Sequence, residues 1–163
     1  MEGTAASGGG VRPKVVVFDL DGCVWYPEMY MMWGGGAPFT VQPNGDLKDR
    51  SGSKCYLMGA VRDIMHSLKT DSGWGETQVA VASSCDEPSW ARECLTKFLV
   101  GEGIPLSDIV SPNLIEIYKA SSKQVHLKAI SKASGVPLSE MMFLDKCVTL
   151  PAHAIDLPPH PLL

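Results

Sequence analysis

The sequence lacks a long apolar run and has few aromatic and charged residues. It contains 163 residues, of which 7% are aromatic and 20% are charged. No apolar run approaches the roughly 18 residues that a membrane-spanning helix needs, and residues 1–10 lack the basic and apolar regions of a signal peptide. We therefore expect no association with a membrane, and a cytoplasmic location.

An excess of positive charge is also missing. The chain carries 14 Lys and Arg residues against 18 Asp and Glu residues, which gives a net charge of -4. Because nucleic acids and anionic membranes are bound by clustered positive charge, this balance predicts no nucleic acid as a partner. An anionic small substrate needs a local pocket with cations of its own.

The cysteine and histidine patterns exclude several common sites. The number of cysteines is odd and no two form a C-x-x-C pair, so neither a disulfide framework nor a structural zinc site is predicted. We expect reduced, buried thiols at positions 23, 55, 85, 94 and 147. The histidines have no metal-ligand spacing, and we expect His66 and His126 on helix surfaces.

Composition divides the chain into three parts, and 45% apolar residues are enough for one sizeable core. Residues 1–13 are small and Gly-rich, which predicts a flexible tail. Residues 14–146 form the expected domain. Residues 147–163 contain several prolines and one charged residue, Asp156, and we expect an irregular tail there with no regular element.

Short apolar strands alternate with helical patterns through the domain. The predicted strands are residues 14–20, 78–83, 114–118 and 141–144. The first predicted helix is residues 59–69. The second begins at Asp86 and Pro88 and is closed by Gly101 and Gly103. The third runs from Ser121 or Ser122 to Gly135 and carries the apolar residues Val125, Ala129, Ile130 and Ala133. This alternation indicates an α/β fold with a Rossmann-like, doubly wound parallel sheet, whose ligands bind beyond the carboxyl ends of the strands.

A glycine-rich and proline-rich region lies between the first strand and the first helix. Asn44-Gly45 separates residues 39–41 from Leu47, which predicts a β-hairpin with a type I′ turn. A second turn is expected at Ser51-Gly52.

Two carboxylates follow the first strand in the string VVVFDLDG. Asp19 and Asp21 have i, i+2 spacing, which directs both side chains the same way from an extended backbone. Paired carboxylates repel one another unless a hard cation lies between them, and oxygen ligands suit Mg²⁺. One carboxylate could then attack phosphorus as a nucleophile. The alternative is a pair of exposed turn residues.

The string FDLDG resembles the first motif of the haloacid dehalogenase (HAD) superfamily, and further strings resemble its magnesium-dependent phosphatases of protein-tyrosine or sugar-phosphate type. The resemblance implies Asp19 as the nucleophile that forms an aspartyl-phosphate, and Asp21 as the general acid and base. It also implies Mg²⁺ as the cofactor and a small phosphorylated metabolite or a phosphoprotein as the substrate.

The same resemblance assigns the remaining site residues. VAVAS is similar to the second motif, with Ser83 as a phosphate donor and Ser84 beside it. EIYKASSK is similar to the third motif, with Lys123 on phosphate, and MMFLD to the fourth, with Asp145 as a metal ligand together with Asp19 and Asp21. Members of the subgroup have no cap domain, and a short flap, here about residues 39–57, covers the site.

The chain departs from the family pattern at three places. Cys23 replaces a usual Thr or Val, and Lys146 replaces a common second Asp, which we expect to weaken metal binding. After Asp145 the chain continues into residues 147–163 instead of a further helix and strand. The alternative function is therefore a truncated, catalytically impaired product that at most binds phosphate or a partner weakly.

Two other hypotheses remain open. Cys85 and Arg92 suggest a thiolate phosphatase, although six residues separate them where that phosphate loop has five. Dehalogenase or phosphomutase chemistry on the same scaffold is disfavoured by the chain's length. Several aromatic residues, Trp25, Tyr26, Tyr30 and Trp33, cluster after the first motif, for packing or for stacking on a substrate.

Overall fold

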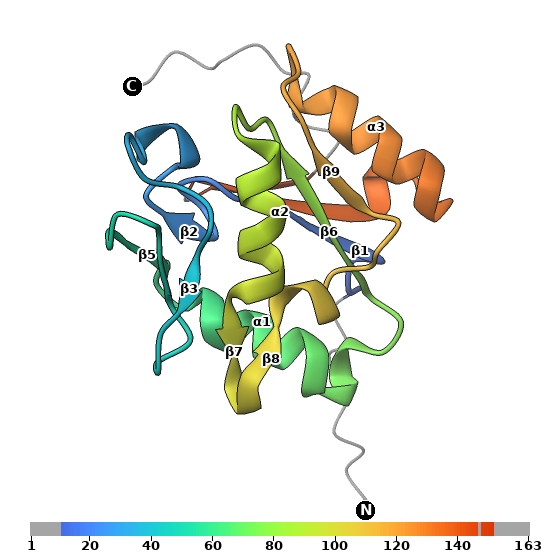
Figure 1. Ribbon diagram of the computed structural model, residues 1–163. Coiled ribbons are helices and arrows are strands. Elements are labelled where there is room, and N and C mark those ends of the chain that lie inside the picture. The colour runs from blue at the N-terminus through green and yellow to red at the C-terminus, as the bar shows by residue number, and fades with distance from the viewer. Residues whose placement is uncertain (1–10, 147, 152–163) are drawn as a thin grey trace, which may run out of the picture.

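A five-stranded sheet organises the computed structural model, which describes residues 11–146 and 148–151 (Figure 1). Its strand order is β11-β10-β1-β6-β9, and β10, β1, β6 and β9 are parallel. The strands are β1 (Val15–Phe18), β6 (Gln78–Ser83), β9 (Ile115–Ile117), β10 (Met141–Asp145) and β11 (Val148–Pro151). The predicted α/β fold with a parallel sheet is confirmed.

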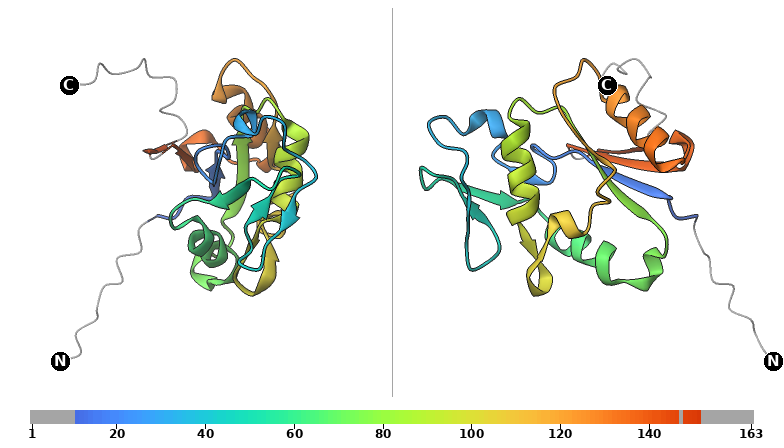
Figure 2. Two further views of the ribbon diagram at one scale, coloured as in Figure 1. Left: turned by 60° about the vertical axis from the view of Figure 1, so that its left-hand side comes forward. Right: turned by 45° about the vertical axis from the view of Figure 1, so that its right-hand side comes forward.

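Helices cover both faces of this sheet, as the two views of Figure 2 show. They are α1 (Val61–Thr70), α2 (Pro88–Lys97) and α3 (Lys123–Ser134). Alternate residues of β1 point to opposite faces, so Val16 and Phe18 pack with α1 and α2, whereas Val15 and Val17 pack with α3. Both faces of β1 are therefore buried, which explains its uninterrupted apolar sequence.

Local capping signals determine where the helices begin. Pro88 occupies the first turn of α2, and the Ser122 hydroxyl accepts a hydrogen bond from the Gln124 N–H at the start of α3. Gly135 ends α3 in the left-handed conformation that glycine adopts without strain, with φ of 72°.

The predicted end of α2 is wrong. The helix stops at Lys97, because the chain turns extended at Phe98, and β7 (Leu99–Val100) then pairs with β8 (Ile104–Pro105). Gly101 and Gly103 lie in the short 3-10 turn between those strands. The remaining 3-10 turns are Met29–Met31, Ser72–Trp74, Leu106–Asp108 and Leu138–Glu140.

A second sheet, here called the flap sheet, lies beside α2 (Figure 1). Its strand order is β2-β5-β4-β3, and its strands are β2 (Trp25–Tyr26), β3 (Thr40–Val41), β4 (Leu47–Lys48) and β5 (Lys54–Leu57). Glu93 of α2 accepts a hydrogen bond from the Phe39 N–H at 2.8 Å, and Lys97 Nζ donates to the Phe39 carbonyl at 2.5 Å. These contacts fasten the flap sheet to α2.

The predicted hairpin forms, but its turn type is wrong. Among the described residues only Glu102 has a positive φ without being glycine, so Asn44 does not adopt the conformation that a type I′ turn requires. The Gly45 N–H instead donates to the Gln42 carbonyl, and Gly45 alone takes a positive φ of 83°. The turn at Ser51-Gly52 is confirmed, with the Gly52 N–H on the Asp49 carbonyl.

The expectation of no regular element after residue 147 is wrong for β11. This strand pairs antiparallel with β10, which leaves β10 with a neighbour on each side. Residues 152–163 and the predicted tail up to residue 10 lie outside the described residues. In the part of the chain that the structure describes, no helix has the length and apolar character needed to cross a membrane.

Candidate active site

The strand order reverses beside β1, and this places two aspartates together. The chain runs from β1 to β6 and β9 on one side and returns to β10 on the other. Asp19 follows β1 and Asp145 ends β10, and the Asp19 N–H donates to the Leu144 carbonyl at 2.9 Å. Ligands of doubly wound sheets bind at such a reversal. A cavity of about 420 Å³ opens there and is lined by both aspartates.

Lys123 contacts the first aspartate directly. Its Nζ donates to Asp19 Oδ1 at 2.5 Å and to the Ala82 carbonyl at 2.9 Å. Asp19 is only 5% exposed, so an uncompensated charge there would be costly, and the ammonium of Lys123 compensates it. The contact brings together the ends of β1 and β6 and the first residue of α3.

Asp145 is the second carboxylate of the pair. Burial raises its pKa to about 6, and the neighbouring carboxylate of Asp19 adds to the rise. Within residues 11–146, its buried Oδ1 has no hydrogen-bond partner. Two adjoining carboxylates are stable when a proton or a cation lies between them. An unpartnered buried oxygen beside a second carboxylate therefore fits a divalent cation.

The described residues hold no group of three His, Cys, Asp or Glu side chains close enough to bind a metal ion by themselves. Mg²⁺ does not need such a group, since it commonly binds one or two carboxylates and completes its shell with water and substrate phosphate. Asp19 and Asp145 supply the two carboxylates. The donor set at this reversal of strand order therefore fits Mg²⁺ better than it fits zinc.

Asp21 lines the same cavity, but the structure does not group its carboxylate with those of Asp19 and Asp145 as the predicted third metal ligand. Oδ1 accepts a hydrogen bond from Trp25 Nε1 at 2.8 Å, and Oδ2 accepts one from the Met29 N–H at 3.1 Å. Burial raises the pKa of Asp21, the bonds from Met29 and Trp25 oppose this, and the charges of Asp19 and Glu28 add to the rise. A raised pKa suits a group that must carry a proton near neutral pH.

The two serines at the end of β6 have different positions. Ser84 is exposed and lines the cavity, and its hydroxyl exchanges hydrogen bonds with the backbone of Ala120. Ser83 is 1% exposed and is not among the residues that line the cavity. The cavity lining thus includes Ser84 together with Lys123 and the three aspartates of the predicted site, and it does not include Ser83.

The thiolate alternative is not supported. Cys85 is buried, and burial, with the charge of Asp21, raises the pKa of its thiol to about 12, so the thiol stays protonated. Its Sγ lies 3.8 Å from Asp21 Oδ2, and Arg92 is exposed and does not line the cavity.

Comparison with known proteins identifies the family. A family model described as acid phosphatase matches residues 11–149. The chain belongs to this family. It is 31% identical over 140 residues to a HAD-like hydrolase superfamily protein of Schizosaccharomyces pombe, which covers 82% of this chain and 75% of that protein. It is also 26% identical over 133 residues to Magnesium-dependent phosphatase 1 of Homo sapiens, covering 82% of this chain and 67% of that protein.

This acid phosphatase family member is thus a phosphatase of the HAD superfamily, as the first motif predicted. Two further residues line its cavity that the sequence did not single out, Glu28 and Asp86. Tyr30 and Lys146, which the sequence did single out, line it too. Lys146 had been expected beside the metal site, but its Nζ lies 3.3 Å from Glu28 Oε1, which raises the pKa of the lysine. The sequence signal for Glu28 was only its position shortly after the first motif.

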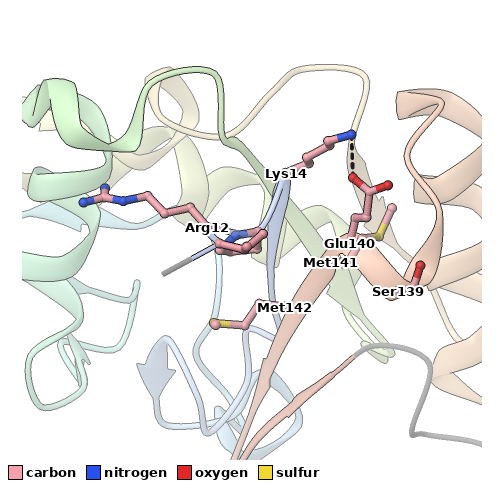
Figure 3. A pocket seen from close by; sticks show the side chains of 8 residues that line it. Arg12, Lys14, Ser139, Glu140, Met141 and Met142 are labelled. Atoms are coloured by element: carbon pink, nitrogen blue, oxygen red, sulfur yellow. Dashed lines mark ion pairs between the residues drawn. The ribbon is translucent and has the colours of Figure 1, made fainter. Parts of the chain in front are cut away.

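The phosphatase has a second cavity, of about 350 Å³, at the opposite ends of β1 and β10 (Figure 3). Its lining includes Arg12, Met141 and Met142, and Lys14 Nζ lies 2.5 Å from Glu140 Oε2 at its rim. This cavity is more apolar than the first and contains none of the predicted site residues. It lies at the amino ends of the strands, where doubly wound sheets do not place their catalytic groups.

Proposed function

We propose that this phosphatase hydrolyses phosphomonoesters with Mg²⁺ through an aspartyl-phosphate intermediate on Asp19. Asp19 and Asp145 are the carboxylates that hold the metal, and Asp21 is the general acid and base. The observation that carries the proposal is the contact of Asp19 with Lys123 at the cavity that Asp145 also lines. The name of the human relative, a magnesium-dependent phosphatase, supports the choice of metal.

The first half of the reaction forms a bond from an Asp19 oxygen to phosphorus. The bond from phosphorus to the leaving oxygen breaks, and the Asp21 carboxylic acid gives its proton to that oxygen. In the second half, the Asp21 carboxylate takes a proton from a water whose oxygen attacks phosphorus, and the bond to Asp19 breaks. The raised pKa of Asp21 supports its protonated form at the start.

Positive charge must balance the phosphoryl oxygens throughout. When bound, Mg²⁺ supplies a Lewis acid that offsets this charge. Lys123 has three N–H donors, of which one binds Asp19 and one binds the Ala82 carbonyl. The third is left for a phosphoryl oxygen. The Ser84 hydroxyl at the cavity wall is a second donor, and Ser83 stays a predicted phosphate contact.

The proposed substrates are phosphotyrosine in a protein or a sugar phosphate. Exposed side chains, Tyr30, Ser84 and Asp86, line the cavity, so its entrance can admit a bulky leaving group. The flap sheet is short and is fastened to α2, and none of residues 39–57, the predicted flap, lines the cavity. The four described cysteines are free thiols, which suits the reducing cytoplasm that we propose as the location. Three of them are buried as predicted, whereas Cys23 is only partly buried.

Hydrolysis of p-nitrophenyl phosphate by the purified chain tests the function. We expect turnover with Mg²⁺, none with EDTA, and a loss of at least about 10³-fold in Asp19→Asn, because the nucleophile is removed. Asp63→Asn is the matched control, since Asp63 is exposed on α1, away from the cavity. Folded wild-type protein without turnover would favour the impaired product that binds phosphate or a partner weakly.

A further inference from the structure

We propose that Trp25 is a positioning residue for the acid Asp21, and that its indole N–H orients the carboxyl group toward the leaving oxygen of the ester. This inference rests on the proposed function, in which Asp21 donates a proton to that oxygen. Trp25 itself does not line the cavity.

Two donors fix the plane of the Asp21 carboxyl group. Trp25 Nε1 lies 2.8 Å from Oδ1, and the Met29 nitrogen lies 3.1 Å from Oδ2. The Cys85 thiol, with Sγ 3.8 Å from Oδ2, is a weaker third donor. Rotation about the last side-chain bond would break at least one of the two shorter bonds. Oδ1, which accepts from Trp25 alone, keeps a further lone pair that can carry the acidic proton. The two bonds therefore fix the orientation of the Asp21 carboxyl group and still leave a site for its proton.

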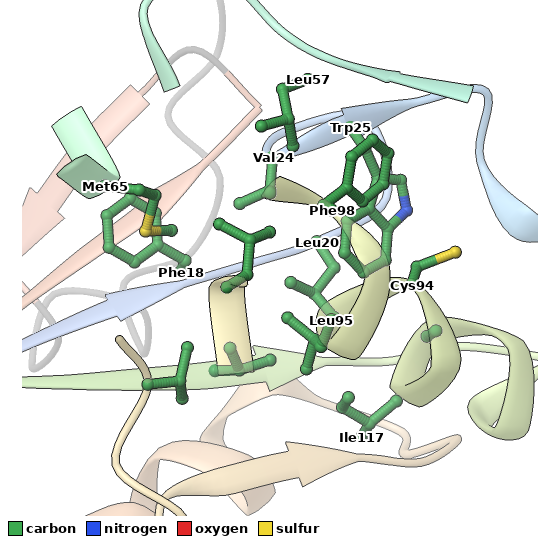
Figure 4. Close-up of a cluster of buried hydrophobic side chains, with 14 of the residues drawn as sticks. Phe18, Leu20, Val24, Trp25, Leu57, Met65, Cys94, Leu95, Phe98 and Ile117 are labelled. Carbon is green, nitrogen blue, oxygen red and sulfur yellow. The ribbon is translucent and has the colours of Figure 1, made fainter. Parts of the chain in front are cut away.

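The indole that makes this bond is itself immobile. Trp25 is 0% exposed, and its ring stacks on Phe98 with centroids 5.6 Å apart and an interplanar angle of 18°. Figure 4 shows the two rings together among buried side chains that include Leu57 and Cys94. The Trp25 backbone pairs with Leu57 of β5, and a bridge joins it to Asp21.

Packing alone does not account for a tryptophan at this position. Phenylalanine could also stack on Phe98 in an apolar interior, whereas an indole brings an N–H that needs an acceptor when it is buried. The acceptor here is the carboxylate of a proposed catalytic acid, four residues earlier in the chain. Trp25→Phe therefore removes the donor and keeps most of the packing.

The rate effect of this change depends on the leaving group. Phenyl phosphate needs a proton on its departing oxygen, whereas dinitrophenyl phosphate leaves as a stable anion. The value of kcat/KM reports the first chemical half of the reaction. A misoriented Asp21 carboxyl group therefore lowers kcat/KM for phenyl phosphate and leaves kcat/KM for dinitrophenyl phosphate nearly unchanged. A general loss of structure lowers both values by the same factor.

The experiment measures kcat/KM for both esters in the wild-type chain and in Trp25→Phe, with folding checked by thermal unfolding. We expect a loss of at least about tenfold on phenyl phosphate and less than about twofold on dinitrophenyl phosphate. Phe98→Leu is the matched control, since it disturbs the same stack and keeps the N–H donor, and its two losses are expected to be equal. Equal losses in Trp25→Phe, or none, would overturn the positioning role.

Two further measurements separate this role from the proposed function. In an Asp21→Asn background, Trp25→Phe is expected to cause no additional loss on phenyl phosphate, and an additional loss of tenfold would overturn the inference. The NMR signal of the Trp25 indole N–H is expected to have a different chemical shift in the Asp21→Asn variant than in the wild-type chain. An unchanged chemical shift would also overturn the inference. A wild-type chain inactive on both esters would instead contradict the proposed function.

Discussion

Lys123 Nζ lies 2.5 Å from Asp19 Oδ1, although 104 positions separate the two residues in the sequence. Both side chains are largely buried, with exposed fractions of 19% and 7%. The pair exists because β1 and the start of α3 meet at the reversal of strand order. It places a cation against the proposed nucleophile before any substrate arrives.

Removal of this cation is expected to impair catalysis strongly. Lys123→Met removes the ammonium and leaves Asp19 without its partner, so we expect kcat/KM for p-nitrophenyl phosphate to fall by about 10²–10³-fold. Steady-state kinetics measures the change. Lys128→Met, an exposed lysine on the same helix, is the control and should leave kcat/KM within about twofold of wild type. Similar losses in both variants would contradict a specific role for Lys123.

Binding of Mg²⁺ is expected to weaken in acid. The pKa of Asp145 is raised to about 6, chiefly by burial and then by Asp19, so a proton competes with the metal below that pH. Calorimetry should show the dissociation constant for Mg²⁺ rising about tenfold per pH unit below pH 6 and levelling above it. Asp145→Asn should bind weakly at every pH. A constant affinity between about pH 5 and 7 would contradict Asp145 as a ligand.

The loop between β2 and β3 of the flap sheet contains a matched pair of glycines. Gly34 and Gly36 both have positive φ, 73° and 80°, but a Cβ on Gly36 would lie 2.4 Å from the Trp90 ring, whereas one on Gly34 meets nothing within 4 Å. We expect Gly34→Ala to lower the free energy of unfolding by about 1 kcal/mol and Gly36→Ala by at least about 2 kcal/mol more. Urea unfolding measures both. Equal losses would show that Trp90 moves aside freely.

Asp49 is expected to stabilise the flap sheet. It is 5% exposed and accepts hydrogen bonds from the backbone of Gly36, Ser51 and Ser53 and from the Ser51 hydroxyl. Burial raises the pKa of Asp49, but these bonds, led by the Ser51 hydroxyl, outweigh it and lower the pKa below its usual value. We expect Asp49→Asn to cost about 2–4 kcal/mol, because the amide presents one acceptor oxygen and a repelling NH₂ group.

The lowered pKa of Asp49 also sets the sign of a pH effect. A carboxyl group with a folded-state pKa below its unfolded value adds stability above the unfolded value of 3.8, and this stability disappears as the pH falls through the folded value. The difference in unfolding free energy between wild type and Asp49→Asn should therefore shrink in strong acid. A difference that does not depend on pH would contradict the account.

The fold was predictable where local chemistry decides it. The apolar string of β1, the serine cap of α3 and Gly135 gave correct element positions, since each depends on neighbours in sequence. The prediction that His126 lies on a helix surface is wrong. Val125 is 46% exposed, while His126 is 0% exposed, with Nε2 2.9 Å from the Tyr118 carbonyl. A buried histidine needs such a partner, and the sequence does not show the partner.

The candidate site was predictable through motif resemblance, and its contacts were not. Nothing in the spacing of Asp19 and Asp21 indicates that one carboxylate faces Lys123 while the other is held by Trp25. These contacts depend on the turn after β1 and on strand pairing in the flap sheet. The ion pair of Lys146 with Glu28 likewise joins residues 118 positions apart, which only the folded topology brings together.

The aspartyl-phosphate itself provides the most direct test of the proposed mechanism. The chain is mixed with a phosphomonoester and Mg²⁺, quenched in acid within the first turnover, and digested for peptide mass spectrometry. We expect a phosphoryl group on Asp19, and none in Asp19→Asn or when EDTA replaces Mg²⁺. Rapid turnover without phosphate on Asp19, or with phosphate on another residue, would contradict the mechanism.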